Sequence, residues 1–196
     1  MEDDYDSEFR YDGSPLTALQ GIDDAERVVY FGTFAKALLP GLRIGYVVAP
    51  EALMDALIDI RQRSDRQPST LLEGAVADFL DQGYFAAHLR RARRRARAQR
   101  DVLVEALAEF ADVLETDTPS QGLHLVAFFR SASSDVQIVK QLHAKGVVAT
   151  ALSPQYIDVT PRQGLILGFS GFTTPELRHA AAVVGGTMRQ AARSAA

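Results

Sequence analysis

Two short hydrophobic runs around a single lysine constrain the fold of this chain more than any other feature. Residues 27–34 (RVVYFGTF) and 42–50 (LRIGYVVAP) are rich in β-branched and aromatic side chains. Runs of this length and composition, bounded by glycine, threonine or proline, are typical of buried β-strands. Lys36 lies between them in the small-residue turn GTFAK. The pattern therefore predicts two strands, with a lysine just beyond the end of the first one.

Helical patterns follow these strands. Apolar residues recur at helical spacing in three successive segments, 50–63, 68–83 and 84 to about 111. In the second segment Ser69 or Thr70 can cap the helix, and Glu73 lies at capping-box distance from Thr70. The third segment is long enough to connect two lobes.

The second half of the chain alternates between the two kinds of element. We expect strands in residues 123–129, 147–153 and 164–172, and helices in residues 134–146 and from 173 onward. This order is typical of α/β or α+β folds.

Composition excludes several classes of protein. The 196 residues, 47% of them hydrophobic, are sufficient for a buried core. The net charge of -4 lacks the basic balance typical of nucleic-acid-binding proteins. There is no cysteine and the four histidines are scattered, so we expect neither disulfides nor a metal site. No apolar run approaches the roughly 20 residues that span a bilayer, and the start MEDDYDSEF is acidic, so we expect a cytoplasmic protein without membrane contact.

Seven arginines between Arg90 and Arg100 allow two interpretations. A basic run can bind nucleic acid. It can also coat the solvent side of an exposed helix. Apolar residues keep helical spacing through this run, at Leu89, Ala92, Ala96 and Leu103. That spacing favours the solvated face.

Lys36 is the residue whose side chain most clearly suggests a chemical role. An amine held among apolar side chains loses hydration, which lowers its pKa from about 10.4 and makes it a nucleophile toward carbonyl groups. The competing interpretation is that Lys36 extends from a loop into solvent beside the strand.

Several other residues supply the groups that would accompany such a lysine. Asp3 and Asp4 stand beside Tyr5, which places carboxylates next to a phenol. Thr33 and Arg43 flank the lysine and are donor types that bind phosphate. An amine, a carboxylate, a phenol and an arginine are the parts of a pyridoxal phosphate site. Taken separately, the acidic cluster is also compatible with a solvated loop, and Arg43 with an ordinary surface arginine.

The segments EDDYDSEFRY (2–11) and VVYFGTFAKALLPGLRIGYVVAP (28–50) resemble the fold type I aminotransferases. They are most similar to the aminotransferase-like domain of MocR-branch, GntR-type transcriptional regulators. The resemblance implies an α/β chain that forms the C-terminal part of this fold. Residues 1–84 would complete the mixed sheet of the large cofactor-binding domain. Residues 85–196 would form a connector helix and a small α+β domain.

The resemblance also implies site residues and a cofactor, pyridoxal 5'-phosphate. Lys36 would bind it as a Schiff base. Asp3 would hold the pyridine nitrogen, and Tyr5 would donate to the phenolic oxygen of the ring. Arg43 would clamp the phosphate, with the Thr33 hydroxyl as a second phosphate ligand.

Two positions depart from the family pattern, and the first is Ala35, where the family usually has serine. Ile166 stands where related enzymes carry an arginine that binds the substrate carboxylate, and Arg162 lies four residues upstream.

Three functions stay open: an aminotransferase acting on an amino acid or amine, an effector-sensing domain of a regulator, and an inactive truncated remnant. We expect a homodimer that meets DNA only through a domain absent from this chain. The charged start, with no element before it, suggests a fragment.

Overall fold

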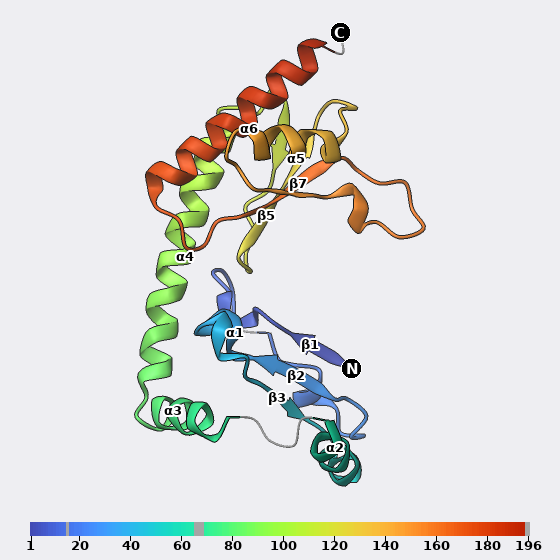
Figure 1. The fold of residues 1–196 in the computed structure, drawn as a ribbon, viewed down its shortest axis with the longest axis vertical. Coiled ribbons are helices and arrows are strands. Elements are labelled where there is room, and N and C mark those ends of the chain that lie inside the picture. The colour runs from blue at the N-terminus through green and yellow to red at the C-terminus, as the bar shows by residue number, and fades with distance from the viewer. Residues whose placement is uncertain (15, 65–68, 195–196) are drawn as a thin grey trace. The chain divides into compact units, whose positions relative to one another are not determined.

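The computed structural model describes residues 1–14, 16–64 and 69–194, which form two compact units (Figure 1). One unit comprises residues 1–93 and the other residues 94–196. The boundary between them falls within the long helix α4 (Tyr84–Ala108), whereas the predicted domain boundary is at the start of this helix. Each unit has its own sheet.

The first unit is built on a three-stranded sheet. Its strands are β1 (Glu2–Asp4), β2 (Tyr30–Thr33) and β3 (Gly45–Val48), in that spatial order. β2 pairs with β1 in parallel and with β3 antiparallel. The two predicted strands are confirmed in shorter form. β1 was not predicted, because a three-residue acidic strand has no hydrophobic alternation to reveal it.

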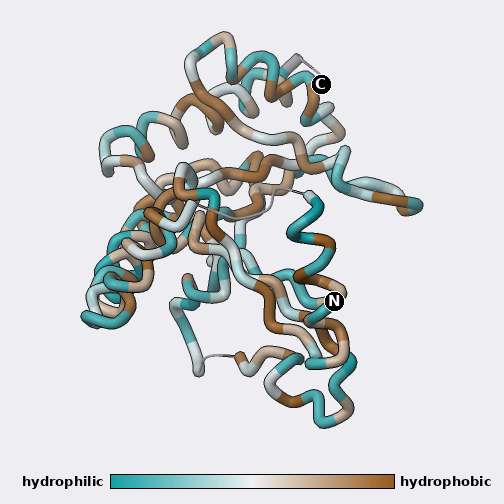
Figure 2. Tube along the Cα trace, turned by 60° about the horizontal axis from the view of Figure 1, so that its bottom comes forward, coloured by the Kyte–Doolittle hydropathy of each residue, from teal (hydrophilic) through white to brown (hydrophobic). Residues whose placement is uncertain are grey.

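Four helices belong wholly or partly to this unit. They are α1 (Phe34–Ala37), α2 (Glu51–Ser64), α3 (Thr70–Asp81) and the first part of α4. The capping box predicted for α3 is wrong: the Ser69 side chain makes no capping hydrogen bond, and the Glu73 N–H donates to the Ser69 carbonyl at 3.0 Å. Hydrophilic and hydrophobic stretches alternate along the helices, as expected for amphipathic helices (Figure 2).

The second unit contains a four-stranded antiparallel sheet. Its strands are β4 (Leu114–Thr116), β5 (His124–Phe129), β6 (Thr150–Ala151) and β7 (Gly164–Gly168), in the spatial order β4-β5-β7-β6. In the two central strands every second residue is buried, namely Leu125, Ala127, Leu165 and Leu167. Strands β5 to β7 confirm the predictions in shorter form, whereas β4 was not predicted.

Helices complete the core of this unit. α5 (Asp135–Ala144) packs against α6 (Thr174–Ser194), β6 and β7. Helical side chains that are almost fully buried include Leu103, Leu107, Ile138, Leu142, Val184 and Met188. α6 begins with a capping box, in which the Glu176 carboxylate accepts the Thr173 N–H at 2.7 Å and the Glu176 N–H donates to the Thr173 hydroxyl at 3.5 Å.

A buried carboxylate joins three parts of the second unit. The Asp135 side chain is fully buried. It accepts hydrogen bonds from the Ser153 N–H at 2.7 Å, the Ser153 hydroxyl at 2.6 Å and the Gly164 N–H at 3.2 Å. The start of α5 is thereby tied to the turn after β6 and to the first residue of β7.

Within the described ranges, none of the helices has both the length and the apolar character needed to cross a membrane.

Two adjacent glycines of α6 give a matched test of this packing. A Cβ at Gly185 would overlap the ring of Phe110, whereas a Cβ at Gly186 would meet nothing within 4 Å. We expect Gly185→Ala to lower the free energy of unfolding by about 1–3 kcal/mol through overpacking. We expect Gly186→Ala to raise it by up to about 1 kcal/mol, because alanine favours the helix. Denaturant titration of both variants checks this pair, and equal effects would contradict the packing.

Candidate functional site

The pairing of β1 with β2 brings the predicted acidic residues to the edge of the sheet where the lysine follows. The two strands are parallel, with Asp3 opposite Phe31 and Asp4 opposite Gly32. Parallel strands end at the same edge of a sheet. Tyr5, which directly follows β1, therefore lies at the same edge as Thr33, the last residue of β2.

The chain beyond Thr33 keeps the remaining predicted residues at this edge. α1 starts at the next residue and carries Lys36. Arg43 comes two residues before β3, whose first residue, Gly45, pairs with Thr33. The Phe34 N–H also donates to the Ile44 carbonyl at 3.1 Å, which closes the loop between the two strands. The topology thus gathers the five sequence-predicted residues at one edge.

Lys36 itself is exposed, contrary to the expected apolar surroundings. Aromatic contacts fix the start of α1: the Phe34 ring lies 5.4 Å from the Tyr46 ring and 5.9 Å from the Phe85 ring, between ring centroids. His88 of α4 fixes the other end of α1, because its Nε2 lies 2.9 Å from the Ala37 carbonyl oxygen. The backbone that carries Lys36 is therefore held at both ends.

Thr33 and Arg43, the two proposed phosphate ligands, have different surroundings. The Thr33 hydroxyl accepts the Ala35 N–H at 3.1 Å, which caps α1, and donates to the Ile44 carbonyl at 3.4 Å. Its role as a phosphate ligand would have to replace this second, long hydrogen bond. Arg43 is exposed and has left-handed backbone geometry, with φ of 52°.

The acidic segment is fixed by a residue to which the sequence analysis gave no separate role. Asp4 accepts the Tyr30 hydroxyl at 2.7 Å and the Ser7 hydroxyl at 2.5 Å through Oδ2, and the Ser7 N–H at 3.0 Å through Oδ1. Burial by itself raises the pKa of Asp4, but these hydrogen bonds outweigh burial and leave the pKa below its ordinary value of 3.8. Burial and the Asp4 carboxylate both raise the pKa of Tyr30.

A glycine makes room for the aromatic side chains on this face of the sheet. Gly32 pairs with Tyr46, and a Cβ on Gly32 would overlap the Tyr46 ring. The Tyr46 ring lies 6.0 Å from Tyr30 and 5.4 Å from Phe34, between centroids. The glycine therefore allows one ring to contact residues on both sides of it. A glycine in a strand pattern, which can mark a close approach, was the available signal for this contact.

The arginine run of α4 is mostly solvent-facing. Exposed side chains are those of Arg90, Arg91, Arg94, Arg95 and Arg97. Arg93 donates to the Glu8 carbonyl, and Arg100 is buried and donates to the Pro119 carbonyl at 2.6 Å. Two of the seven arginines thus hold loops, which neither interpretation of the run included.

In the second unit, Ile166 and Arg162 share one face of the sheet. Ile166 pairs with Val126, and its neighbours Leu165 and Leu167 are buried on the helix side. Arg162 stacks on the ring of Phe128, two residues from Val126, with its guanidinium carbon 3.6 Å from the ring centroid. Its guanidinium also lies 3.4 Å from the Glu115 carboxylate. Arg162 is therefore held on the sheet face that Ile166 occupies.

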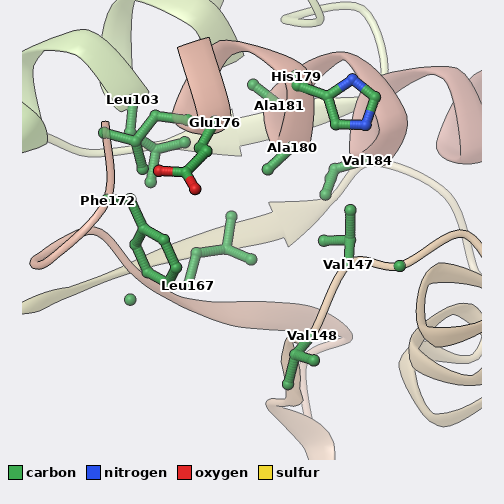
Figure 3. A pocket seen from close by; sticks show the side chains of 13 residues that line it. Leu103, Val147, Val148, Leu167, Phe172, Glu176, His179, Ala180, Ala181 and Val184 are labelled. Carbon is green, nitrogen blue, oxygen red and sulfur yellow. The ribbon is translucent and has the colours of Figure 1, made fainter. Parts of the chain in front are cut away.

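The second unit also contains a partly open apolar cavity of about 350 Å³. Figure 3 shows Leu103, Leu167, Phe172 and Val184 around it, with Glu176 and His179 as its ionisable neighbours. Its lining includes none of the five predicted site residues. This cavity could not be predicted from the sequence, because most of its lining is the ordinary apolar side of helices and strands.

A family model and several known proteins match most of this chain. Residues 6–184 match the family described as aminotransferase class I and II. The probable rhizopine catabolism regulatory protein MocR of Rhizobium meliloti is 43% identical over 180 residues, which make up 91% of this chain and 36% of that protein. The uncharacterized HTH-type transcriptional regulator YhdI of Bacillus subtilis (strain 168) is 35% identical over 91% of this chain and 38% of its own length.

A solved structure has the same fold. The kynurenine aminotransferase of Pyrococcus horikoshii, in complex with PMP, superposes with a TM-score of 0.88 and 25% identity. The match covers 97% of this chain and 47% of that one. This likeness confirms the predicted α/β fold. The chain spans less than half the length of each of these three proteins.

The hydrogen bonds of Asp4 predict its titration. A carboxylate whose folded pKa is lowered stabilises the fold above its unfolded pKa, and this contribution is lost as the pH falls through the folded value. For Asp4 that loss lies below pH 3.8. Ser7→Ala removes one of the donors, so we expect the pKa of Asp4 to rise toward its ordinary value. Carbon-13 NMR titration of the carboxyl group measures this shift, and an unchanged pKa would contradict the hydrogen bond. Asp24→Asn, at an exposed position, is the control.

Proposed function

Since the chain belongs to the class I and II aminotransferase family, we propose that the edge of its three-stranded sheet holds pyridoxal 5'-phosphate, the cofactor that the family implies. The observation that carries this proposal is the parallel pairing of β1 with β2, which gathers a carboxylate, a phenol and an amine at one edge. The chemical types fit the cofactor, because a cationic ring nitrogen, a phenolic oxygen, an aldehyde and a phosphate each have a complementary group there.

Each of the five residues has a proposed task. The Asp3 carboxylate pairs with the pyridine nitrogen, and the Tyr5 hydroxyl donates to the phenolic oxygen. The Lys36 amine would hold the cofactor through its aldehyde, with water as the leaving group. Arg43 neutralises the phosphate, and Thr33 donates a hydrogen bond to it. Asp3, Tyr5, Lys36 and Arg43 are exposed, which leaves their polar groups accessible to a ligand.

The proposed activity is that of a transaminase-like protein acting on an amino acid or an amine. Bound pyridoxal phosphate supplies an electron sink for the bonds at the substrate α carbon. The Lys36 amine would hold and move a proton at that carbon as a general base and acid. Isoleucine at position 166 cannot bind the substrate carboxylate as the expected arginine would. Arg162, on the same sheet face, is the residue we propose as a candidate ligand for that carboxylate.

A second proposal is that the domain senses an effector and does not turn it over. Two named transcriptional regulators among the relatives favour it. In this proposal DNA is bound by a domain outside this chain, and Lys36 acts as a ligand-dependent switch. Release of a keto acid from an amino acid in the presence of the cofactor favours the enzyme; binding without release favours the sensor. The inactive remnant, the homodimer and the cytoplasmic location stay predictions.

Chemical labelling tests the lysine. We expect pyridoxal phosphate followed by borohydride to attach the cofactor stably to Lys36, as read by peptide mapping. The chain has only two other lysines, Lys140 and Lys145, so the map is simple. Lys36→Ala should abolish the label, whereas Lys140→Ala, at an exposed position, should leave it unchanged. A label shared equally among the three lysines would overturn the proposed site.

The phosphate clamp has its own test. We expect Arg43→Ala to weaken binding of pyridoxal phosphate about tenfold or more, because one charge-assisted pair with the phosphate is lost. Binding of pyridoxal, which has no phosphate, should change little in the same variant. Absorbance titration of both compounds measures the difference. Equal weakening for the two would show that Arg43 acts on something other than the phosphate.

A further inference from the structure

One carboxylate near the proposed site is bonded to two different parts of the chain. Asp4 accepts the hydroxyl of Tyr30 in β2, 26 residues away, and both the hydroxyl and the N–H of Ser7, three residues away. It therefore links the neighbouring strand to the turn that follows β1. Hydrogen bonds to an ionised carboxylate are stronger than bonds between neutral groups.

Asp4 lies between Asp3 and Tyr5, so its hydrogen bonds affect where these two residues lie. Successive side chains of a strand point to opposite faces, so Asp3 and Asp4 lie on opposite faces of β1. Asp4, Gly32 and Tyr30 share one face, since Asp4 pairs with Gly32 and Tyr30 is two residues from it. The bonds from Asp4 to Ser7 also span Tyr5, which is 51% exposed.

Other contacts also hold this segment. β1 is three residues long and, within the described residues, pairs with β2 alone. The Glu2 carboxylate accepts the Leu19 N–H at 3.0 Å and the Gln20 N–H at 3.1 Å. The Glu2 N–H donates to the Val29 carbonyl at 2.8 Å, which fixes the start of the strand. Asp4 provides the corresponding attachment at its end.

We propose that Asp4 is a positioning residue for Asp3 and Tyr5, which it holds at the sheet edge by bridging Tyr30 and Ser7. This inference rests on the proposed cofactor site, but the bridge itself does not require the cofactor. The hydroxyl of Tyr30 is the part of the bridge that ties it to β2. Removing this single oxygen also removes its hydrogen bond with Tyr46, but it leaves the ring of Tyr30 able to keep its contact with the Tyr46 ring.

The first experiment measures the bridge without cofactor. Tyr30→Phe should raise the hydrogen-exchange rate of the Ser7 amide by about tenfold, because the Asp4 carboxylate that accepts this amide loses its hydrogen bond to the Tyr30 hydroxyl. Tyr84→Phe removes the same oxygen from an exposed tyrosine in the same unit and should leave the rate unchanged. An unchanged Ser7 rate in Tyr30→Phe overturns the inference, whether or not the chain binds pyridoxal phosphate.

The second experiment measures the effect on the site. In the wild-type chain, labelling of Lys36 establishes the cofactor site; its absence would refute the proposed function and leave the exchange result to decide whether Asp4 holds the segment. With the site established, Tyr30→Phe should weaken pyridoxal phosphate binding about three- to tenfold. It should also reduce the visible circular dichroism of the bound chromophore, which reports the asymmetry of its surroundings.

The melting temperature separates positioning from unfolding. Tyr30→Phe and Asp4→Asn should both change the dichroism while melting within a few degrees of the wild type. Asp4→Asn serves as the second variant, because an asparagine keeps the shape of the side chain but lacks the charge. Wild-type dichroism and affinity in both variants would overturn the positioning role. Loss of the signal in the Tyr84→Phe control would overturn it as well.

Discussion

The parallel pairing of β1 with β2 is the interaction on which the proposed site depends. It consists of three residue pairs, from Glu2 opposite Tyr30 to Asp4 opposite Gly32. A shift of one residue would move Asp3 to the other face of the sheet, since side chains alternate along a strand. The hydrogen bond from Tyr30 to Asp4 fits the observed register. The chemistry proposed for Lys36 therefore requires correct registration of a segment almost thirty residues upstream.

The sequence allowed prediction of those elements whose hydrophobic period is strong. The runs around Lys36 and the apolar strands of the second unit predicted β2, β3, β5 and β7, and Tyr84 marked the start of α4. β1 and β4 escaped prediction because each is three residues long and includes charged or polar residues. The capping box predicted at α3 is absent, whereas the start of α6 has one between Thr173 and Glu176. A capping pattern in the sequence shows only that the bond is possible.

The residues of the proposed site come from the sequence, whereas their surroundings could be predicted only partly. The resemblance to a family supplied five residues, and the topology brings them to one edge. It did not supply the supporting contacts of Asp4 with Tyr30 or of His88 with Ala37, because these join residues 26 and 51 positions apart. The exposure of Lys36 also differs from the expectation, because flanking apolar letters do not reveal which side chains cover an amine.

The contact between Gly32 and Tyr46 limits which substitutions this sheet can accept in evolution. The space above the glycine is filled by a ring from the next strand. A methyl group can be introduced at position 32 only if the ring at position 46 moves aside or is replaced by a smaller side chain, and either change would disturb its contacts with the rings of Tyr30 and Phe34. These two positions are therefore coupled, and accepted mutations at one should be accompanied by compensating mutations at the other.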